Sequence, residues 1–362
     1  MFLQRLTIMN YRNITECNIA FSPKINCFLG RNGMGKTNLL DAIYYLSFCR
    51  SSINPIDIQN INYGQDVFMI QGNYLRNDTQ EQIACSVKQR RKKQFTRNKK
   101  EYERLADHIG LIPLVLSSPM DTELIDGGSD QRRRFVDMAV AQYDRNYLNA
   151  LMRYNHALQS RNALLKADSP LDSAVLDVLE EQMSACAKLI FDRRKAFIAE
   201  FTPVFQQYYM HIAEEQETVD LHYISHNEQG ELAQLLREVR DRDRIIGYTS
   251  RGIHKDDLEM MLDNYPIKRR GSQGQNKTFL IALRMAQFFF LASACEQTPI
   301  LLFDDLFDKL DALRVQRIID IVASDKFGQI FITDTNRNHL DNILRSVTSD
   351  TRIFEVEQGS VL

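Results

Sequence analysis

The feature that most constrains the fold of this chain is a glycine-rich segment at residues 30–37, where the sequence reads GRNGMGKT. It follows a short apolar run at 25–29 and precedes a stretch with helical spacing at 37–48. The order strand, loop, helix and the spacing G-x-x-x-x-G-K-[ST] are typical of a phosphate-binding loop (P-loop), whose glycines let backbone N–H groups face phosphate oxygens. We therefore predict a nucleotide site. Its expected residues are Gly30, Arg31, Asn32, Gly33, Met34, Gly35, Lys36 and Thr37.

The side chains around this loop have distinct expected roles. Lys36 can reach the β- and γ-phosphates of ATP and is a predicted catalytic residue, and the Thr37 hydroxyl can ligate Mg²⁺. A second signal is the apolar run at 300–303, which ends in Asp304 and Asp305, as in a buried parallel strand that presents acids near the phosphates. We expect Asp304 to bind Mg²⁺, directly or through water. We expect Asp305 to orient or deprotonate the attacking water.

A third motif lies between the first two in the chain. Residues 271–275 read GSQGQ and precede a helix that is expected to begin near Asn276. Small residues and a serine at a helix N-terminus form an anion site, although alone this pattern more often describes a plain capped helix. Its position favours the signature motif of ABC-type ATPases, and residues 308–311 (DKLD) stand where those proteins carry the D-loop. The nucleotide contacts predicted here are Ser272, Gly274 and Gln275.

The order of elements along the chain indicates an α/β protein with a helical insertion. From residue 130 to about 209 there is no glycine, and apolar spacing predicts two long helices with Pro170 in the turn between them. We predict an ABC-ATPase head in which a P-loop lobe with a mixed sheet comprises residues 1–115 and 245–362. Residues 116–244 are predicted to form an inserted, mainly helical lobe.

Charge limits how the chain could contact nucleic acid. The formal net charge is −2 over 362 residues, so any such contact must come from a local patch. The segment 88–104 holds most of the local positive charge, with Phe95 and Tyr102 interleaved, and is either a DNA contact or a solvated hairpin. The arginines at 132–134 could bind DNA or pair with acids across a lobe interface.

Other residues argue against metal clusters and membranes. The six cysteines are scattered without a C-x-x-C pair, and no uncharged apolar run approaches about 18 residues, so we expect a cytoplasmic protein with no membrane partner. His254, Asp256 and Asp257 could resemble metal ligands, but a structural loop is the favoured interpretation.

With these motifs in place, the chain resembles the RecF family across nearly its whole length. The resemblance rests on the order of the motifs and on the segments 6–13 (LTIMNYRN), 129–137 (SDQRRRFVD) and 252–258 (GIHKDDL). It also rests on the signature form Ser-Gln-Gly-Gln at 272–275 and on the acid pair Asp304-Asp305. This chain has Asp41 at a position where the family usually has glutamate. No switch histidine follows the strand that ends at 333–335, which puts a γ-phosphate contact from that loop in doubt.

The resemblance implies an SMC-like head that dimerises on DNA with ATP. It further implies action at gapped DNA and single-strand/double-strand junctions, partnership with RecO and RecR, and help in loading recombinase during the SOS response. A weak ATPase is expected, because Asp305 is one methylene shorter than the glutamate that ABC transporters usually have at this position. DNA is expected to stimulate its activity. The alternative is the nucleotide-binding subunit of an ABC transporter. Gln273 and the absent histidine argue against it.

Overall fold

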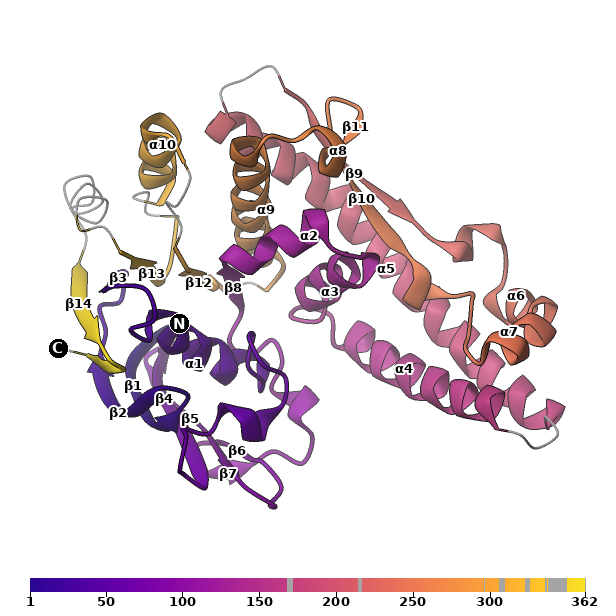
Figure 1. The fold of residues 1–362 in the computed structure, drawn as a ribbon, viewed down its shortest axis with the longest axis horizontal. Helices are drawn as coiled ribbons and strands as arrows, with labels where there is room; N and C mark the ends of the chain where they lie inside the picture. The colour runs from indigo at the N-terminus through magenta and orange to yellow at the C-terminus, as the bar shows by residue number, and fades with distance from the viewer. Residues whose placement is uncertain are drawn as a thin grey trace. The chain divides into compact units, whose positions relative to one another are not determined.

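The structure is a computed structural model that describes residues 1–167, 172–213, 217–295, 297–305, 310–322, 326–335, 337 and 350–361. Its contacts divide the chain into two compact units (Figure 1). The first comprises Met1–Asp121, His211–Glu214 and Gln273–Leu362, and the second comprises Thr122–Met210 and Glu215–Ser272. The second unit therefore extends to Ser272, beyond the boundary expected at residue 245.

The first unit contains an antiparallel six-stranded sheet in the order β2-β1-β4-β5-β6-β7. Its strands are β1 (Phe2–Tyr11), β2 (Ile14–Ala20), β4 (Val67–Arg76), β5 (Thr79–Lys88), β6 (Gln94–Arg97) and β7 (Lys100–Glu101). In β4 and β5 buried side chains alternate with more accessible ones, as in a sheet with one face on the core.

A second six-stranded sheet, in the order β15-β14-β3-β13-β12-β8, carries the nucleotide motifs. Its strands are β3 (Ile25–Leu29), β8 (Leu114–Ser117), β12 (Ile300–Phe303), β13 (Ile330–Asp334), β14 (Thr351–Glu357) and β15 (Ser360–Val361). All neighbours pair in parallel except β14 and β15, which form a hairpin. Strands β12 and β13 are buried throughout, as expected for parallel strands covered on both faces. The fold is α/β, as predicted. The parallel pairing brings the carboxyl ends of β3 and β12 to one edge of this sheet.

The helices of the first unit are α1 (Lys36–Phe48), α9 (Gln273–Ala294) and α10 (Ala312–Val322). By length and hydropathy α9 could cross a membrane, but 61% of its most apolar window is buried. It contacts β8, and Arg284 on it pairs with Asp121 at 2.6 Å. We therefore assign α9 as a core helix.

The second unit combines helices with a three-stranded sheet in the order β11-β10-β9. Its helices are α2 (Thr122–Asp126), α3 (Ser129–Val140), α4 (Arg145–Lys166), α5 (Ser173–Ala213), α6 (Leu232–Glu238), α7 (Arg240–Ile246) and α8 (Ile267–Arg270), with the end of α5 counted in the first unit. Its strands are β9 (Val219–Ile224), β10 (Asp257–Leu262) and β11 (Tyr265–Pro266). The short 3₁₀ turns of the two units are η1 (Asp57–Asn60), η2 (Leu105–Asp107), η3 (Pro119–Asp121), η4 (His226–Gln229) and η5 (Ile253–Lys255). The two long helices predicted from spacing are α4 and α5, and Pro170 lies outside the described residues.

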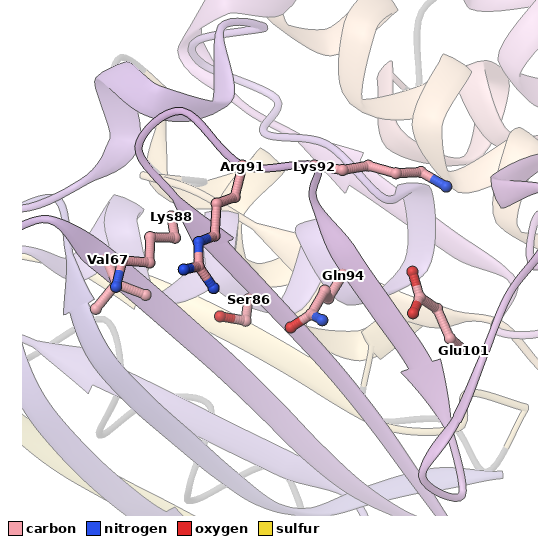
Figure 2. Close-up of a pocket in the computed structure, with 7 residues that line it drawn as sticks. All are labelled: Val67, Ser86, Lys88, Arg91, Lys92, Gln94 and Glu101. Atoms are coloured by element: carbon pink, nitrogen blue, oxygen red, sulfur yellow. The ribbon is translucent and has the colours of Figure 1, made fainter.

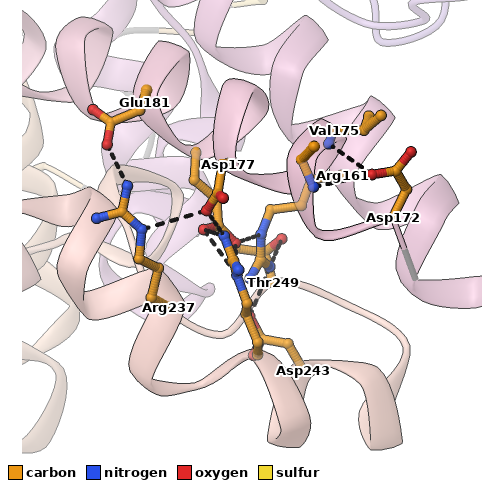
Figure 3. A network of polar contacts seen from close by, with 11 residues as sticks. Arg161, Asp172, Val175, Asp177, Glu181, Arg237, Asp243 and Thr249 are labelled. Atoms are coloured by element: carbon orange, nitrogen blue, oxygen red, sulfur yellow. Dashed lines mark hydrogen bonds and ion pairs between the residues drawn. The ribbon is translucent and has the colours of Figure 1, made fainter. Parts of the chain in front are cut away.

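A buried ionic network joins three helices of the second unit (Figure 3). Arg161 on α4 has no exposed surface and contacts Glu180 on α5 at 3.0 Å and Asp243 on α7 at 2.7 Å. Thr249 accepts a further hydrogen bond from the same guanidinium at 2.8 Å. Since a buried ion pair that loses one partner costs about 3–5 kcal/mol, this network fixes the mutual packing of the three helices.

Candidate nucleotide-binding site

The P-loop connects β3 to α1, and its glycines stand where a side chain would cause backbone strain or a steric clash. Gly33 and Gly35 have φ of 80° and 110°, in the region that favours glycine. A Cβ on Gly30 would lie 2.4 Å from the Val356 carbonyl oxygen of β14, so this glycine is required by a close backbone approach. The loop ends at the first turn of α1, whose N–H groups and positive dipole end favour an anion.

Lys36 is buried at the base of this loop. Its side chain is only 5% exposed, and Nζ donates to the backbone carbonyls of Gly30 at 2.8 Å and Arg31 at 3.1 Å. Within the described part of the chain, no carboxylate forms an ion pair with it. A buried ammonium without a counter-ion is costly, so the site is electrostatically suited to a phosphate group.

Thr37 and Asp304 lie side by side, although they are far apart in the sequence. The Thr37 hydroxyl is 2.9 Å from Oδ2 of Asp304, and Thr333 on β13 donates to Oδ1 at 2.7 Å. Burial raises the pKa of the Asp304 carboxyl, opposed by these hydrogen bonds and by the Lys36 charge. A hydroxyl beside a carboxylate is a donor set that Mg²⁺ accepts when phosphate and water oxygens complete the coordination. The chemistry of this pair is compatible with the expected metal role. Among the described residues, no cluster of three or more acidic, histidine or cysteine side chains occurs.

Asp305 follows in a left-handed conformation with φ 47°, which aspartate tolerates better than most residues. Its N–H donates to the Thr333 hydroxyl at 2.9 Å. Thr333 therefore contacts both acids at the end of β12.

The helix at the signature segment begins at an earlier residue than expected. Helix α9 starts at Gln273 rather than near Asn276, so Gly274 and Gln275 lie in its first turn and Ser272 precedes it. A Cβ on Gly274 would lie 3.0 Å from Nη1 of Arg314. Asp308 and Lys309 of the D-loop segment lie outside the described residues.

The basic segment 88–104 separates into anchored and unanchored cations. Lys93 pairs with Asp57 at 2.7 Å and Arg97 with Glu81 at 2.6 Å, so both hold the sheet and its loops together. The exposed cations that have no partner among the described residues are Lys88, Arg90, Arg91, Lys92, Lys99 and Lys100.

Some of these cations line a cavity of about 400 Å³ on the sheet (Figure 2). Arg91 points back over the strands toward Lys88 and Ser86, whereas Lys92 extends the other way. Gln94 and Glu101 complete the polar lining, and Val67 adds an apolar wall. The charged residues of the lining are three cations and one acid, so the lining has a net positive charge and suits an anionic partner.

The second basic cluster has a structural role within its own unit. Arg132 forms a bidentate pair with Asp257 at 2.7 and 3.0 Å, and Arg133 donates to the carbonyl of Asp256 at 2.7 Å. Arg132 therefore pairs with an acid, but within the second unit rather than across a lobe interface. Arg134 is exposed.

The residues that could have suggested a metal site are bound by other groups of the same chain. His254 contacts the Tyr154 hydroxyl at 2.7 Å and the Thr249 carbonyl at 3.0 Å, and Asp256 pairs with the buried Arg194 at 2.9 Å. Burial lowers the pKa of His254 to about 4. These contacts agree with the structural-loop interpretation.

Two residues near the P-loop received no structural role in the sequence analysis. Asn13 lies against Gly35 and accepts from Asn38 at 2.7 Å. Asp41 on α1 is buried and accepts from Tyr11 at 2.6 Å, from Ser51 at 2.7 Å and from the Ser52 hydroxyl at 2.6 Å. An acid on the apolar-spaced helix was the available signal.

The fold and the site together define a P-loop ATPase of the ABC type. A family model described as an AAA domain matches residues 5–317. The "DNA replication and repair protein RecF" of Bacteroides fragilis is 57% identical over 362 residues, covering all of this chain and 98% of that protein. The protein of the same name in Porphyromonas gingivalis is 49% identical, with full coverage of both. The chain therefore belongs to the RecF family of DNA replication and repair proteins.

Solved structures show the same fold. A structure described as the recombination mediator protein RecF with ATP in the RecFOR pathway has a TM-score of 0.88 at 24% identity, covering 100% of this chain and 97% of that one. The SMC head domain from Pyrococcus furiosus has a TM-score of 0.59 at 16% identity, covering 99% and 95%. The head architecture is therefore shared with SMC proteins. Matches named RecF over the full length do not favour a transporter subunit.

Proposed function

We propose that this protein binds ATP and Mg²⁺ at the P-loop and acts on DNA in recombinational repair and replication restart. The observation that carries the proposal is the arrangement of Lys36, Thr37 and Asp304. A buried cation that forms no ion pair within the described part of the chain lies with a hydroxyl and an acid at a helix N-terminus. Together they complement a magnesium-bound triphosphate.

Each copy would contribute two different halves of a composite site. The P-loop and the acids at the end of β12 form one half, with Lys36 and Asp305 in the catalytic roles. Ser272, Gly274 and Gln275 of a second copy form the other half at the start of α9, where helix N–H groups lack intrahelical partners. A two-fold dimer then holds two composite sites. Mg²⁺ would supply charge neutralisation for the phosphates, held by Thr37 and Asp304.

The unanchored cations of segment 88–104 support a DNA-binding role. They are exposed on one sheet, and their charge is not neutralised by described carboxylates. We propose that they contact the phosphate backbone, which supplies affinity without sequence preference. Membership of the RecF family supports gapped DNA and single-strand/double-strand junctions as targets, RecO and RecR as partners in loading recombinase, and a cytoplasmic location.

The experiment that tests this function measures ATP hydrolysis and nucleotide binding with and without gapped DNA. We expect slow hydrolysis that DNA stimulates, since Asp305 is shorter than the usual glutamate. The Lys36→Met variant should lose both nucleotide binding and hydrolysis. Unchanged nucleotide binding by Lys36→Met would contradict the site, and hydrolysis that no DNA alters would contradict the role on DNA.

A further inference from the structure

The C-terminal hairpin touches the P-loop through backbone atoms. Gly359, in the turn between β14 and β15, donates its N–H to the Met34 carbonyl at 2.8 Å. The neighbouring Gln358 N–H lies 3.4 Å from the Met34 sulfur. A turn near the C-terminus therefore contacts the middle of the phosphate-binding loop, which lies in the N-terminal part of the sequence.

This hydrogen bond fixes the orientation of a P-loop amide. In a planar trans peptide the carbonyl of one residue and the N–H of the next point in opposite directions. Because Gly359 holds the Met34 carbonyl on the hairpin side, the Gly35 N–H points away from the hairpin. That N–H has no hydrogen-bond partner among the described residues, so it is available to an anion.

Steric contacts hold the hairpin and the loop in this register. A Cβ on Gly359 would lie 2.2 Å from the Asn13 carbonyl oxygen, and Gly359 has φ 81°. The Asn13 side chain in turn packs against Gly35, where a Cβ would lie 2.9 Å from its Oδ1. Gly359 thus contacts the loop directly through Met34 and indirectly through Asn13.

We infer that Gly359 is a positioning residue of the nucleotide site, which sets the Gly35 amide toward the phosphates through the Met34 carbonyl. The inference rests on the proposed binding of a nucleoside triphosphate at the P-loop. The hairpin makes the triphosphate site dependent on a segment that contains none of the nucleotide motifs.

The direct test compares Gly359→Ala with a matched control, Gly64→Ala. Gly64 lies in the same unit with φ 79°, and a Cβ there would meet nothing within 4 Å. The two glycines have nearly the same positive φ, but only Gly359→Ala pushes the hairpin from Asn13. We expect Gly359→Ala to bind ATPγS roughly ten- to hundredfold more weakly, the effect of misdirecting one hydrogen bond to a charged oxygen. Gly64→Ala should bind as the wild type does.

A folded Gly359→Ala protein with wild-type affinity would overturn the inference, as would an equal loss in Gly64→Ala. Hydrogen exchange on the wild type gives a second test that needs no variant. The Gly359 amide should be protected without nucleotide, and the Gly35 amide should become protected only with ATPγS. Rapid exchange at Gly359 would also overturn the inference. Failure of the wild type to bind ATPγS would instead reject the proposed function itself.

Discussion

The Thr37 hydroxyl lies 2.9 Å from the carboxylate of Asp304, so the P-loop helix and the acidic strand are joined at the predicted magnesium site. Each residue would supply one oxygen to the ion. The Thr37 hydroxyl donates a hydrogen bond to the acid, and Thr333 donates a second one at 2.7 Å.

Replacing Asp304 by asparagine should separate metal binding from stability. We expect Mg²⁺-dependent ATPγS affinity to fall by about tenfold or more, the equivalent of about 1.4 kcal/mol for a lost ligand. Folding should not suffer, because burial raises the pKa of this carboxyl and the neutral amide oxygen still accepts from Thr37 and Thr333. Calorimetric titration at several Mg²⁺ concentrations measures the first effect, and thermal unfolding measures the second. Thr37→Ser is the control, since it retains the hydroxyl; an Asp304→Asn protein with unchanged Mg²⁺ dependence would exclude Asp304 as the ligand.

The pH dependence of this site follows from the same shift. A raised carboxyl pKa means that the folded protein holds the proton more tightly than the unfolded chain does. The ionised acid therefore costs stability as pH rises from the ordinary value of 3.8 through the raised pKa. Mg²⁺ competes with that proton, so Mg²⁺ affinity should increase over the same interval. In Asp304→Asn this increase should be absent.

His108 gives a second pH-dependent prediction, with the opposite sign. The imidazole has no exposed surface and contacts the Leu46 carbonyl at 2.7 Å and the Tyr102 hydroxyl at 3.0 Å. Burial lowers its pKa from 6.5 to about 4, so the stability it contributes is complete above 6.5 and is lost as pH falls toward 4. At pH 5 the loss is about 2 kcal/mol, from 1.5 units at about 1.4 kcal/mol each.

Denaturant unfolding at pH 7 and pH 5 measures this loss in the wild type and in His108→Asn. The variant keeps a hydrogen-bond donor but cannot titrate, so its unfolding free energy should change less between the two pH values. His222→Asn is the control, because the His222 side chain is 52% exposed. An unaltered pH dependence in His108→Asn would reject the assignment.

Charge removal tests the proposed DNA contact. In the triple variant Lys88→Ala, Arg91→Ala, Lys92→Ala, affinity for gapped DNA should fall, and the slope of log affinity against log salt should flatten by up to about three. The matched control removes three exposed cations from α4 and α5, namely Arg153, Lys166 and Lys188. It changes net charge equally and should leave the slope intact. Equal effects in both triples would show that DNA responds to overall charge rather than to this surface.

The sequence predicted those parts of the site that local spacing encodes. Strand β3, the P-loop and α1 are contiguous, and the predicted run at 37–48 differs from α1 by one terminal residue. The apolar run before Asp304 is β12. In these segments the motif and the strand or helix beside it can both be predicted from neighbouring residues in the sequence.

Non-local pairing accounts for what the sequence did not predict. The contact of Gly359 with Met34 depends on the register between β14 and β3, which no local pattern specifies. Likewise, residues 257–262 are grouped with the second unit because β10 pairs with β9, whereas the sequence analysis assigned them to the P-loop lobe. The start of α9 at Gln273 was missed because a serine before small residues equally suits a later cap.

Mixing two inactive variants tests the central claim, that each copy supplies a half of the other copy's site. Lys36→Met disables the P-loop half, and Ser272→Arg disables the signature half. In a mixed dimer one site receives both defects, while the other combines an intact P-loop with an intact signature. We predict that sedimentation velocity with ATPγS shows each variant alone as a monomer and the equimolar mixture as a dimer. Dimers of either variant alone, or a mixture that remains monomeric while the wild type dimerises, would contradict the composite site.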